Sequence, residues 1–205
     1  MAPQKIPKRS KAQPDKAQPR TAQPDKAQPH TIDVVRPPPV RIVGIGASAG
    51  GLDAFSQLFR AMPADTGMAF VLVQHLDPHH KSLLTELLSR ETPMLVHEVT
   101  QGMAVEPNQV YIIPPNTKMV LAQGGLHLSP RGKTPGPSRT VDGFFQSLAA
   151  EQGNRAIAIV LSGADGDGAQ GLAAIKAAGG ITFAQDMASS QFEGMPQSAV
   201  DTGKV

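Results

Sequence analysis

The sequence predicts an α/β domain with a mostly parallel β-sheet. Apolar runs alternate along the chain with segments of helical periodicity, and strands without polar alternation are typical of sheets that are covered on both faces. The first of these runs leads directly into a glycine-rich segment and then into a helical pattern. Tight strand-to-helix turns of this kind connect the elements of α/β domains.

The predicted elements follow from these patterns. The strands are apolar runs bounded by turn residues, at 40–45, 68–73, 110–113, 118–122, 126–129, 156–161 and 181–184. The helices place apolar residues on one face, at 52–62, 81–90, 141–152 and 172–178. The glycine-containing link at 123–125 predicts an antiparallel hairpin of the two strands beside it, and the Pro/Gly-rich segment 130–139 is predicted to be a loop.

Composition limits the function classes. The chain has 205 residues, enough for one well-buried domain, and it has no cysteine. This excludes disulfides, thiol catalysis and thiolate metal sites, and it favours a cytoplasmic location. We expect neither membrane insertion nor a secretory signal, because the apolar runs are too short for a span and no apolar segment follows the basic N-terminus.

Residues 1–38 differ in composition from the rest of the chain. Ala12–Pro19 recurs as Ala22–Pro29, in a segment rich in Pro, Gln, Lys and Ala. We therefore predict a disordered tail with polyproline II character, which serves as a tether, and a folded domain at 39–205. The tail carries the positive charge, because residues 1–40 have a net charge of +5 and residues 41–205 a net charge of −3. Nucleic-acid binding by the domain is therefore not expected.

The glycine-rich segment Val43–Gly51 has three interpretations. Gly46 to Gly50 match the G-x-S-x-G nucleophile elbow, in which small neighbours allow a sharp turn to expose the central Ser48. Gly44 to Ala49 also match the G-x-G-x-x-G/A fingerprint of dinucleotide-binding domains. Finally, any tight turn favours glycine.

Polar residues at the ends of three predicted strands favour the first interpretation. Ser48 follows the first strand, His75 follows the second, and Asp165 and Asp167 lie in the turn 162–168 after the strand 156–161. The carboxyl ends of parallel strands meet at one edge of a sheet. A serine, an imidazole and a carboxylate at that edge form the set of groups needed for acyl transfer.

Each of these residues also has a structural interpretation. His75 could bond only to backbone, and Asp165 or Asp167 could cap the helix that starts near Gly168. The dinucleotide alternative needs an acidic residue at the end of the second strand, and Asp77 lies beyond the expected place.

A metal site built on His75, His79 and His80 is also disfavoured. Pro78 breaks any helix face that these histidines could share, and no acidic residue has ligand spacing. We therefore predict no metal and no cofactor.

The order of the motifs resembles the catalytic domain of the CheB family, the chemotaxis protein-glutamate methylesterases. The matching stretches are 45–51, 73–76, 110–115, 141–145, 161–168 and 192–196. The resemblance implies a doubly wound parallel sheet in a three-layer α/β/α arrangement. It also implies hydrolysis of glutamyl methyl esters on methyl-accepting chemotaxis receptors, with release of methanol, and deamidation of receptor glutamines.

The resemblance also assigns roles by motif. Ser48 is the expected nucleophile, His75 the general base and acid, and Asp167 the carboxylate that orients His75. The backbone N–H groups of Ala49 and Ala164 are expected to form the oxyanion hole.

The chain departs from the family pattern in several places. Ala164 stands where a methionine is usual, and Thr140 where a proline is usual. A repetitive tail replaces the receiver domain, and the chain ends before an expected last strand and helix, which suggests a truncated domain. A receptor methyltransferase, fused or separate, is the expected partner. The alternative function is a receptor-binding domain without activity.

Overall fold

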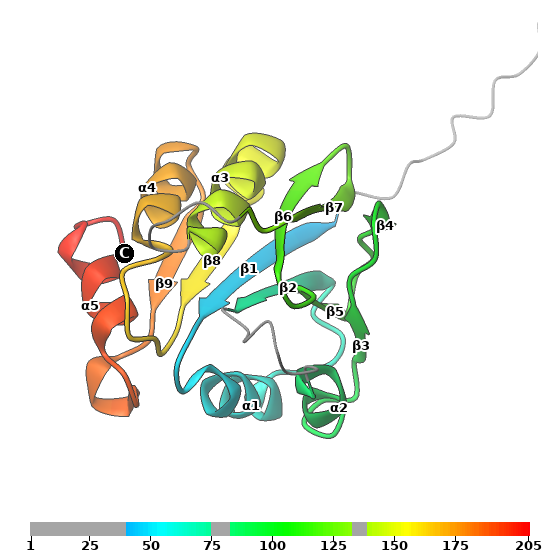
Figure 1. The fold of residues 1–205 in the computed structure, drawn as a ribbon, viewed down its shortest axis with the longest axis horizontal. Helices are drawn as coiled ribbons and strands as arrows, with labels where there is room; N and C mark the ends of the chain where they lie inside the picture. Colours follow the sequence, from blue (N-terminus) through cyan, green and yellow to red (C-terminus); the bar gives the residue numbers. More distant parts are fainter. Residues whose placement is uncertain (1–39, 75–82, 133–138) are drawn as a thin grey trace, which may run out of the picture. The chain divides into compact units, whose positions relative to one another are not determined.

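The main sheet has six parallel strands and is doubly wound. The structure is a computed structural model that describes residues 40–74, 83–132 and 139–205. The strand order is β3-β5-β2-β1-β8-β9, and every pair is parallel (Figure 1). The strands are β1 (Arg41–Ala47), β2 (Met68–Gln74), β3 (Leu95–Glu98), β5 (Gln109–Ile112), β8 (Ile157–Val160) and β9 (Ile181–Ala184). The chain builds outward from β1 in one direction and then in the other, which confirms the predicted fold class.

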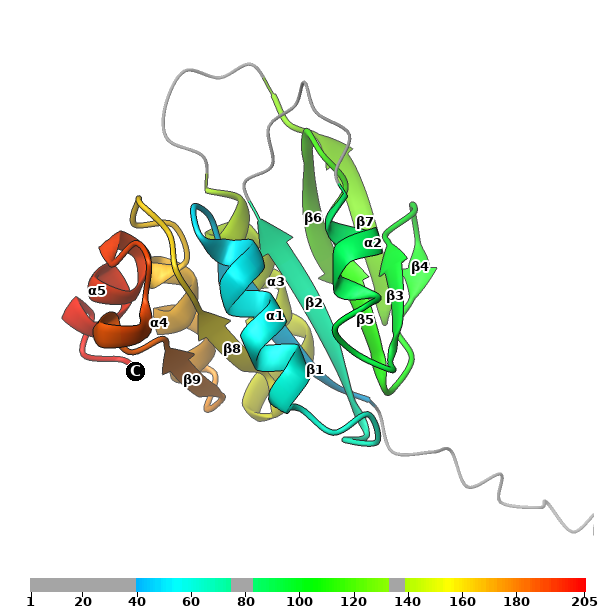
Figure 2. The same cartoon turned by 90° about the horizontal axis from the view of Figure 1, so that it is seen from below.

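Helices cover both faces of this sheet. On one face, α1 (Gly51–Ala61) and α2 (Leu84–Leu88) pack on the apolar side chains of β1, β2 and β5. The other face is covered by α3 (Thr140–Gln152) and α4 (Ala169–Ala177), with α5 (Gly194–Asp201) next to α4 (Figure 2). Apolar side chains of these helices form a second cluster, which includes Met195 and Ala199 of α5. Short 3₁₀ turns occur at Gly153–Arg155 and Met187–Ser189. The result is the three-layer arrangement that was predicted.

The predicted hairpin is part of a small antiparallel sheet. The strands β6 (Thr117–Ala122) and β7 (Gly125–Pro130) pair through a two-residue turn, and β4 (Met103–Ala104) adds to β7. Gln123 and Gly124 both have positive φ, at 52° and 74°. Two such residues form the type I′ turn that suits the twist of a hairpin.

Some elements differ from the prediction. The strands β3 and β4 and the helix α5 were not predicted, and α2 is shorter than the expected helix at 81–90, of which 81 and 82 lie outside the described residues. β3 is an edge strand with an exposed Leu95, so it lacks a continuous apolar run. α5 contains Pro196, which a helix tolerates only in its first turn. The tail 1–38 and most of the loop 130–139 also lie outside the described residues.

Two glycines in β1 allow α3 to pack closely on the sheet. A Cβ atom at Gly46 would lie 2.3 Å from Cγ1 of Val141, and one at Gly44 would lie 3.0 Å from side-chain atoms of Leu148 and Phe145. Gly44 and Gly46 therefore lie within a buried strand, facing a helix. The dinucleotide interpretation needs glycines that admit a pyrophosphate, so this packing argues against it.

The described residues include no helix with the length and apolar character that crossing a membrane requires.

We predict that Gly46→Ala lowers the free energy of unfolding by about 1–3 kcal/mol, as overpacking does elsewhere. The reason is that the Val141 side chain is fully buried and cannot retreat from the added methyl group. Urea denaturation measures the change. Gly143→Ala in α3 is the matched control, because its Cβ would have no neighbour within 4 Å. It should raise stability by about 0.5–1 kcal/mol, and equal effects of both substitutions would contradict the packing argument.

Candidate active site

Ser48 lies on a turn between β1 and α1. β1 ends at Ala47 and α1 begins at Gly51, so Ser48 is the first residue after the strand, and it is partly exposed. Gly50 has φ 73°, and a Cβ there would lie 2.7 Å from Oγ of Ser162. Only glycine fits both the backbone conformation and the space. The strand–turn–helix context expected for a nucleophile elbow is therefore present.

The two strands beside β1 bring further polar groups to the same edge. In the parallel register, Ala47 lies opposite Gln74 of β2 and Gly46 lies opposite Val160 of β8. The Ser48 N–H donates to the carbonyl oxygen of Ser162 at 3.0 Å. The predicted convergence of Ser48 with the turn 162–168 is thus confirmed. His75 lies outside the described residues, and its position stays a prediction.

The Asp167 carboxylate is buried and bound by the start of helix α3. Its Oδ2 accepts the N–H of Val141 and its Oδ1 accepts the N–H of Asp142, both at 2.9 Å, and Asp167 is only 2% exposed. The Asp167 N–H in turn donates to Oδ1 of Asp165 at 3.1 Å. The first N–H groups of a helix carry partial positive charge. They therefore hold the carboxylate in one orientation and stabilise its negative charge.

Asp142 makes the reciprocal contact with helix α4. Its Oδ1 accepts the N–H groups of Gly168 (3.0 Å) and Gly171 (2.7 Å), and its Oδ2 accepts from Arg139 at 3.0 Å. Both carboxylate oxygens of Asp167 thus accept N–H groups of α3, and Asp142 is an acceptor for the start of α4. Asp167, just before α4, therefore binds the start of α3, and Asp142, in α3, binds the start of α4. These hydrogen bonds connect the turn 162–168 to both helices.

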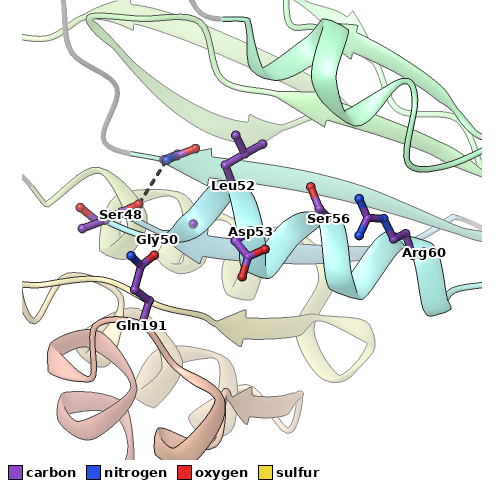
Figure 3. A pocket seen from close by; sticks show the side chains of 10 residues that line it. Ser48, Gly50, Leu52, Asp53, Ser56, Arg60 and Gln191 are labelled. Atoms are coloured by element: carbon purple, nitrogen blue, oxygen red, sulfur yellow. Dashed lines mark hydrogen bonds between the residues drawn. The ribbon is translucent and has the colours of Figure 1, made fainter.

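A pocket of 720 Å³ opens along α1 from Ser48 (Figure 3). It is lined by Ser48, Ala49, Gly50, Gly51, Leu52, Asp53, Ser56, Arg60, Gln74 and Gln191. In Figure 3, Ser48 and Arg60 lie at opposite ends of the pocket. Hydrogen bonds to Glu91 raise the pKa of the Arg60 guanidinium and lower the pKa of Glu91, so an ion pair lies at the Arg60 end.

The two residues expected to supply an oxyanion hole lie on neighbouring turns. Ala49 lines the pocket beside Ser48, and Ala164 is exposed on the turn that follows β8. Their common role stays a prediction. Within the described ranges, no three His, Asp or Glu side chains are grouped so that they could hold a metal. His75, His79 and His80 lie outside those ranges, and the expected lack of a metal or cofactor is untested.

A partly exposed serine on a glycine turn, at the carboxyl edge of a doubly wound sheet, is the arrangement typical of a serine hydrolase. The family model described as CheB methylesterase matches residues 43–205. The chain belongs to the CheB methylesterase family.

Individual relatives agree with this assignment. The chain is 34% identical over 176 residues to protein-glutamate methylesterase/protein-glutamine glutaminase 6 of Anaeromyxobacter dehalogenans, covering 82% of this chain and 50% of the relative. It is 38% identical over 163 residues to the second such protein of Burkholderia lata, covering 79% and 48%. The chain therefore spans about half the length of these curated relatives.

A solved structure and a much larger protein are also similar. The catalytic domain of the Thermotoga maritima CheB methylesterase matches with a TM-score of 0.73 and 27% identity, over 81% of this chain and 90% of that one. An uncharacterized 104.1 kDa protein of Rhodobacter capsulatus is 43% identical over 120 residues, which are 58% of this chain and 12% of that protein.

Four residues of the site had no role assigned from the sequence. Gln74, Asp142 and Ser162 lie in motifs that carried the resemblance, and Gln191 lies beside one. Asp142 carried a local signal, because an acidic residue at the start of a helix often caps it. Besides Arg139, however, its carboxylate binds two N–H groups that are 26 and 29 residues away, at the start of α4. Local spacing contains no signal for such a pairing.

We predict that Asp142→Ala lowers the free energy of unfolding by about 2–3 kcal/mol, because two buried N–H groups at the start of α4 lose their charged acceptor. Urea denaturation provides the measurement. Asp201→Ala is the control, since Asp201 is exposed at the end of α5, and its effect should stay within about 0.5 kcal/mol. A stability loss for Asp142→Ala no larger than that of the control would show that the Asp142 carboxylate contributes little.

Proposed function

We propose that this domain hydrolyses glutamyl methyl esters on chemoreceptor proteins to glutamate and methanol. The observation that carries the proposal is the partly exposed Ser48, on its glycine turn at the head of the pocket, in a chain of the CheB methylesterase family. The names of the relatives also support glutaminase activity, the deamidation of receptor glutamines, as a second reaction of the same site.

Ser48, His75 and Asp167 form the proposed triad. A serine hydroxyl does not ionise by itself near neutral pH, so it needs an adjacent base to accept its proton. His75 follows Gln74, which lies opposite Ala47 at the end of β2, and this sequence position supports its role as the base. The rigid, helix-bound carboxylate of Asp167 suits the task of orienting an imidazole.

The reaction follows in two halves. Ser48 Oγ attacks the ester carbonyl while His75 accepts the hydroxyl proton, and the N–H groups of Ala49 and Ala164 stabilise the resulting oxyanion. The C–O bond to the methoxy group then breaks, and methanol leaves with the proton from His75. A water molecule, deprotonated by His75, attacks the acyl-serine, and the receptor glutamate leaves as Ser48 regains its proton.

We propose methyl-accepting chemotaxis receptors as the protein substrate and the cytoplasm as the location, without nucleic-acid binding or membrane insertion. A receptor methyltransferase, fused or separate, is the proposed partner. Similarity to part of a 104.1 kDa protein is consistent with the occurrence of such domains in longer chains.

The central test is methanol release from a methylated chemoreceptor fragment. The chain should release methanol, and Ser48→Ala should lower the rate by a factor of about 10⁴–10⁶, as loss of the nucleophile does in serine hydrolases. Ser89→Ala, at an exposed position after α2, is the control and should behave like the parent. Equal release by parent and Ser48→Ala would remove Ser48 from the mechanism. If neither the parent nor Ser48→Ala released methanol although both were folded, a receptor-binding domain without activity would be favoured.

The proposed role of the tail as a tether gives a second prediction. A chain that lacks residues 1–38 should release methanol at the same rate as the full chain, because the tail has almost no apolar residues with which to stabilise the domain. The comparison uses the same receptor fragment and equal protein concentrations. A large loss of activity on deletion would assign the tail a direct part in catalysis or substrate binding.

A further inference from the structure

The carbonyl group of Ser48 is held by two donors. The N–H of Gly51 donates to Ser48 O at 3.0 Å. The side-chain amide of Gln74 donates to the same oxygen through Nε2 at 3.2 Å, the bond that the dashed line in Figure 3 marks. In a trans peptide the carbonyl group and the following N–H point in opposite directions. The two donors therefore determine where the N–H of Ala49 points, which is away from Gly51 and Gln74.

The backbone around this peptide is held from the other side by Ser162. The Ser162 hydroxyl donates to Ala49 O at 2.9 Å and accepts the N–H of Phe192 at 3.0 Å, while the Ser162 carbonyl accepts the Ser48 N–H at 3.0 Å. The Ser48 N–H is thus already bonded to the neighbouring turn, the one that follows β8. The next N–H along the chain, that of Ala49, is the donor that we propose for the oxyanion hole.

Gln74 is poorly suited to a purely structural role. Its Oε1 is buried and has no hydrogen-bond partner among the residues that the structure describes, and an unpaired buried amide oxygen carries a desolvation penalty. An apolar side chain of the same length would avoid that penalty. The one hydrogen bond recorded for the Gln74 side chain in the described residues is the bond from Nε2 to Ser48 O.

The turn also leaves room for this amide. A Cβ at Gly51 would lie 3.3 Å from Nε2 of Gln74 and 2.8 Å from Cβ of Ala47. Contacts this short force neighbours to move, so a larger residue at position 51 would displace the Gln74 amide or the strand end. The second glycine of Gly50-Gly51 therefore admits the glutamine.

We propose that Gln74 is a positioning residue for the oxyanion hole. Its amide holds the Ser48 carbonyl pointing toward Gln74, and the Ala49 N–H, on the opposite side of the same peptide, then points to the oxyanion. If this peptide turned over, a carbonyl oxygen would face the developing negative charge in place of a donor. The inference rests on the proposed esterase function and adds to it a residue that acts through Ala49.

The test is Gln74→Met, which keeps the side-chain length and removes the donor. For methanol release from the methylated receptor fragment, kcat should fall roughly 10- to 100-fold, somewhat less than for complete loss of an oxyanion donor. KM and the pH dependence of kcat/KM should stay unchanged, and the unfolding midpoint in urea should not fall. Gln170→Met, at an exposed position on α4, is the control and should leave all four quantities unchanged.

Ser162→Ala provides a useful contrast. It removes the hydroxyl that bonds both Ala49 and Phe192, so it should lower the unfolding midpoint as well as kcat. Gln74→Met, in contrast, should lower kcat without lowering the unfolding midpoint.

A direct readout of the Ala49 amide complements the kinetics. Ethylboronic acid forms a tetrahedral adduct with reactive serines, and its addition should move the Ala49 amide proton resonance downfield in the parent chain. The shift should be lost or much smaller in Gln74→Met.

Several results would overturn the inference. An unchanged kcat in Gln74→Met, with Ser48→Ala inactive, would leave the esterase in place and remove Gln74 from it. A higher KM at unchanged kcat would mean that Gln74 contacts the substrate directly, and a shifted pH profile would mean that it acts through His75. Methanol release that survives Ser48→Ala would instead overturn the proposed function itself, and the inference with it.

Discussion

The parallel pairing of β1 with β2 on one side and β8 on the other is the constraint on which the site depends. It brings three strand ends to one edge of the sheet, so that Ser48 lies beside the turn after β8 and near the end of β2. Helix α3 also packs closely on the central strand β1. Gly44 and Gly46 allow this packing, because side chains there would collide with α3. The strand β1 thus contributes to the fold through Gly44 and Gly46, and it positions Ser48, the proposed nucleophile, at its end.

At this edge of the sheet, the polar side chains form hydrogen bonds mainly with backbone groups of the neighbouring helices and turns. Asp167 binds the start of α3, Asp142 binds the start of α4, and Ser162 bonds the turn that carries Ser48. Burying carboxylates is costly unless several donors compensate, and here helix N-termini provide them. Gln74 departs from this rule, with one amide oxygen left without a partner among the described residues. Unfavourable arrangements of this kind concentrate at functional sites.

The sequence predicted much of this arrangement, for identifiable reasons. The double-sided apolar strands and the glycine link at 123–125 have local signals, and the rule on parallel strand ends was enough to bring Ser48 together with the turn 162–168. β3 and α5 were missed because an exposed edge strand and a short helix with Pro196 lack strong periodicity. The binding of α4 by Asp142, and of Ser48 O by Gln74, joins residues 26 or more positions apart. Such contacts become visible only when the sheet register is known.

The central claim is that Ser48 is a nucleophile activated by this edge of the sheet. The most direct measurement is labelling of the folded chain with a fluorophosphonate, which phosphonylates activated serines, followed by mass spectrometry of its peptides. The account predicts a single adduct at Ser48, and no adduct when the chain is unfolded in urea before the probe is added, because activation depends on the folded site. An adduct on another serine, or no adduct on a chain that urea denaturation shows to be folded, would contradict it.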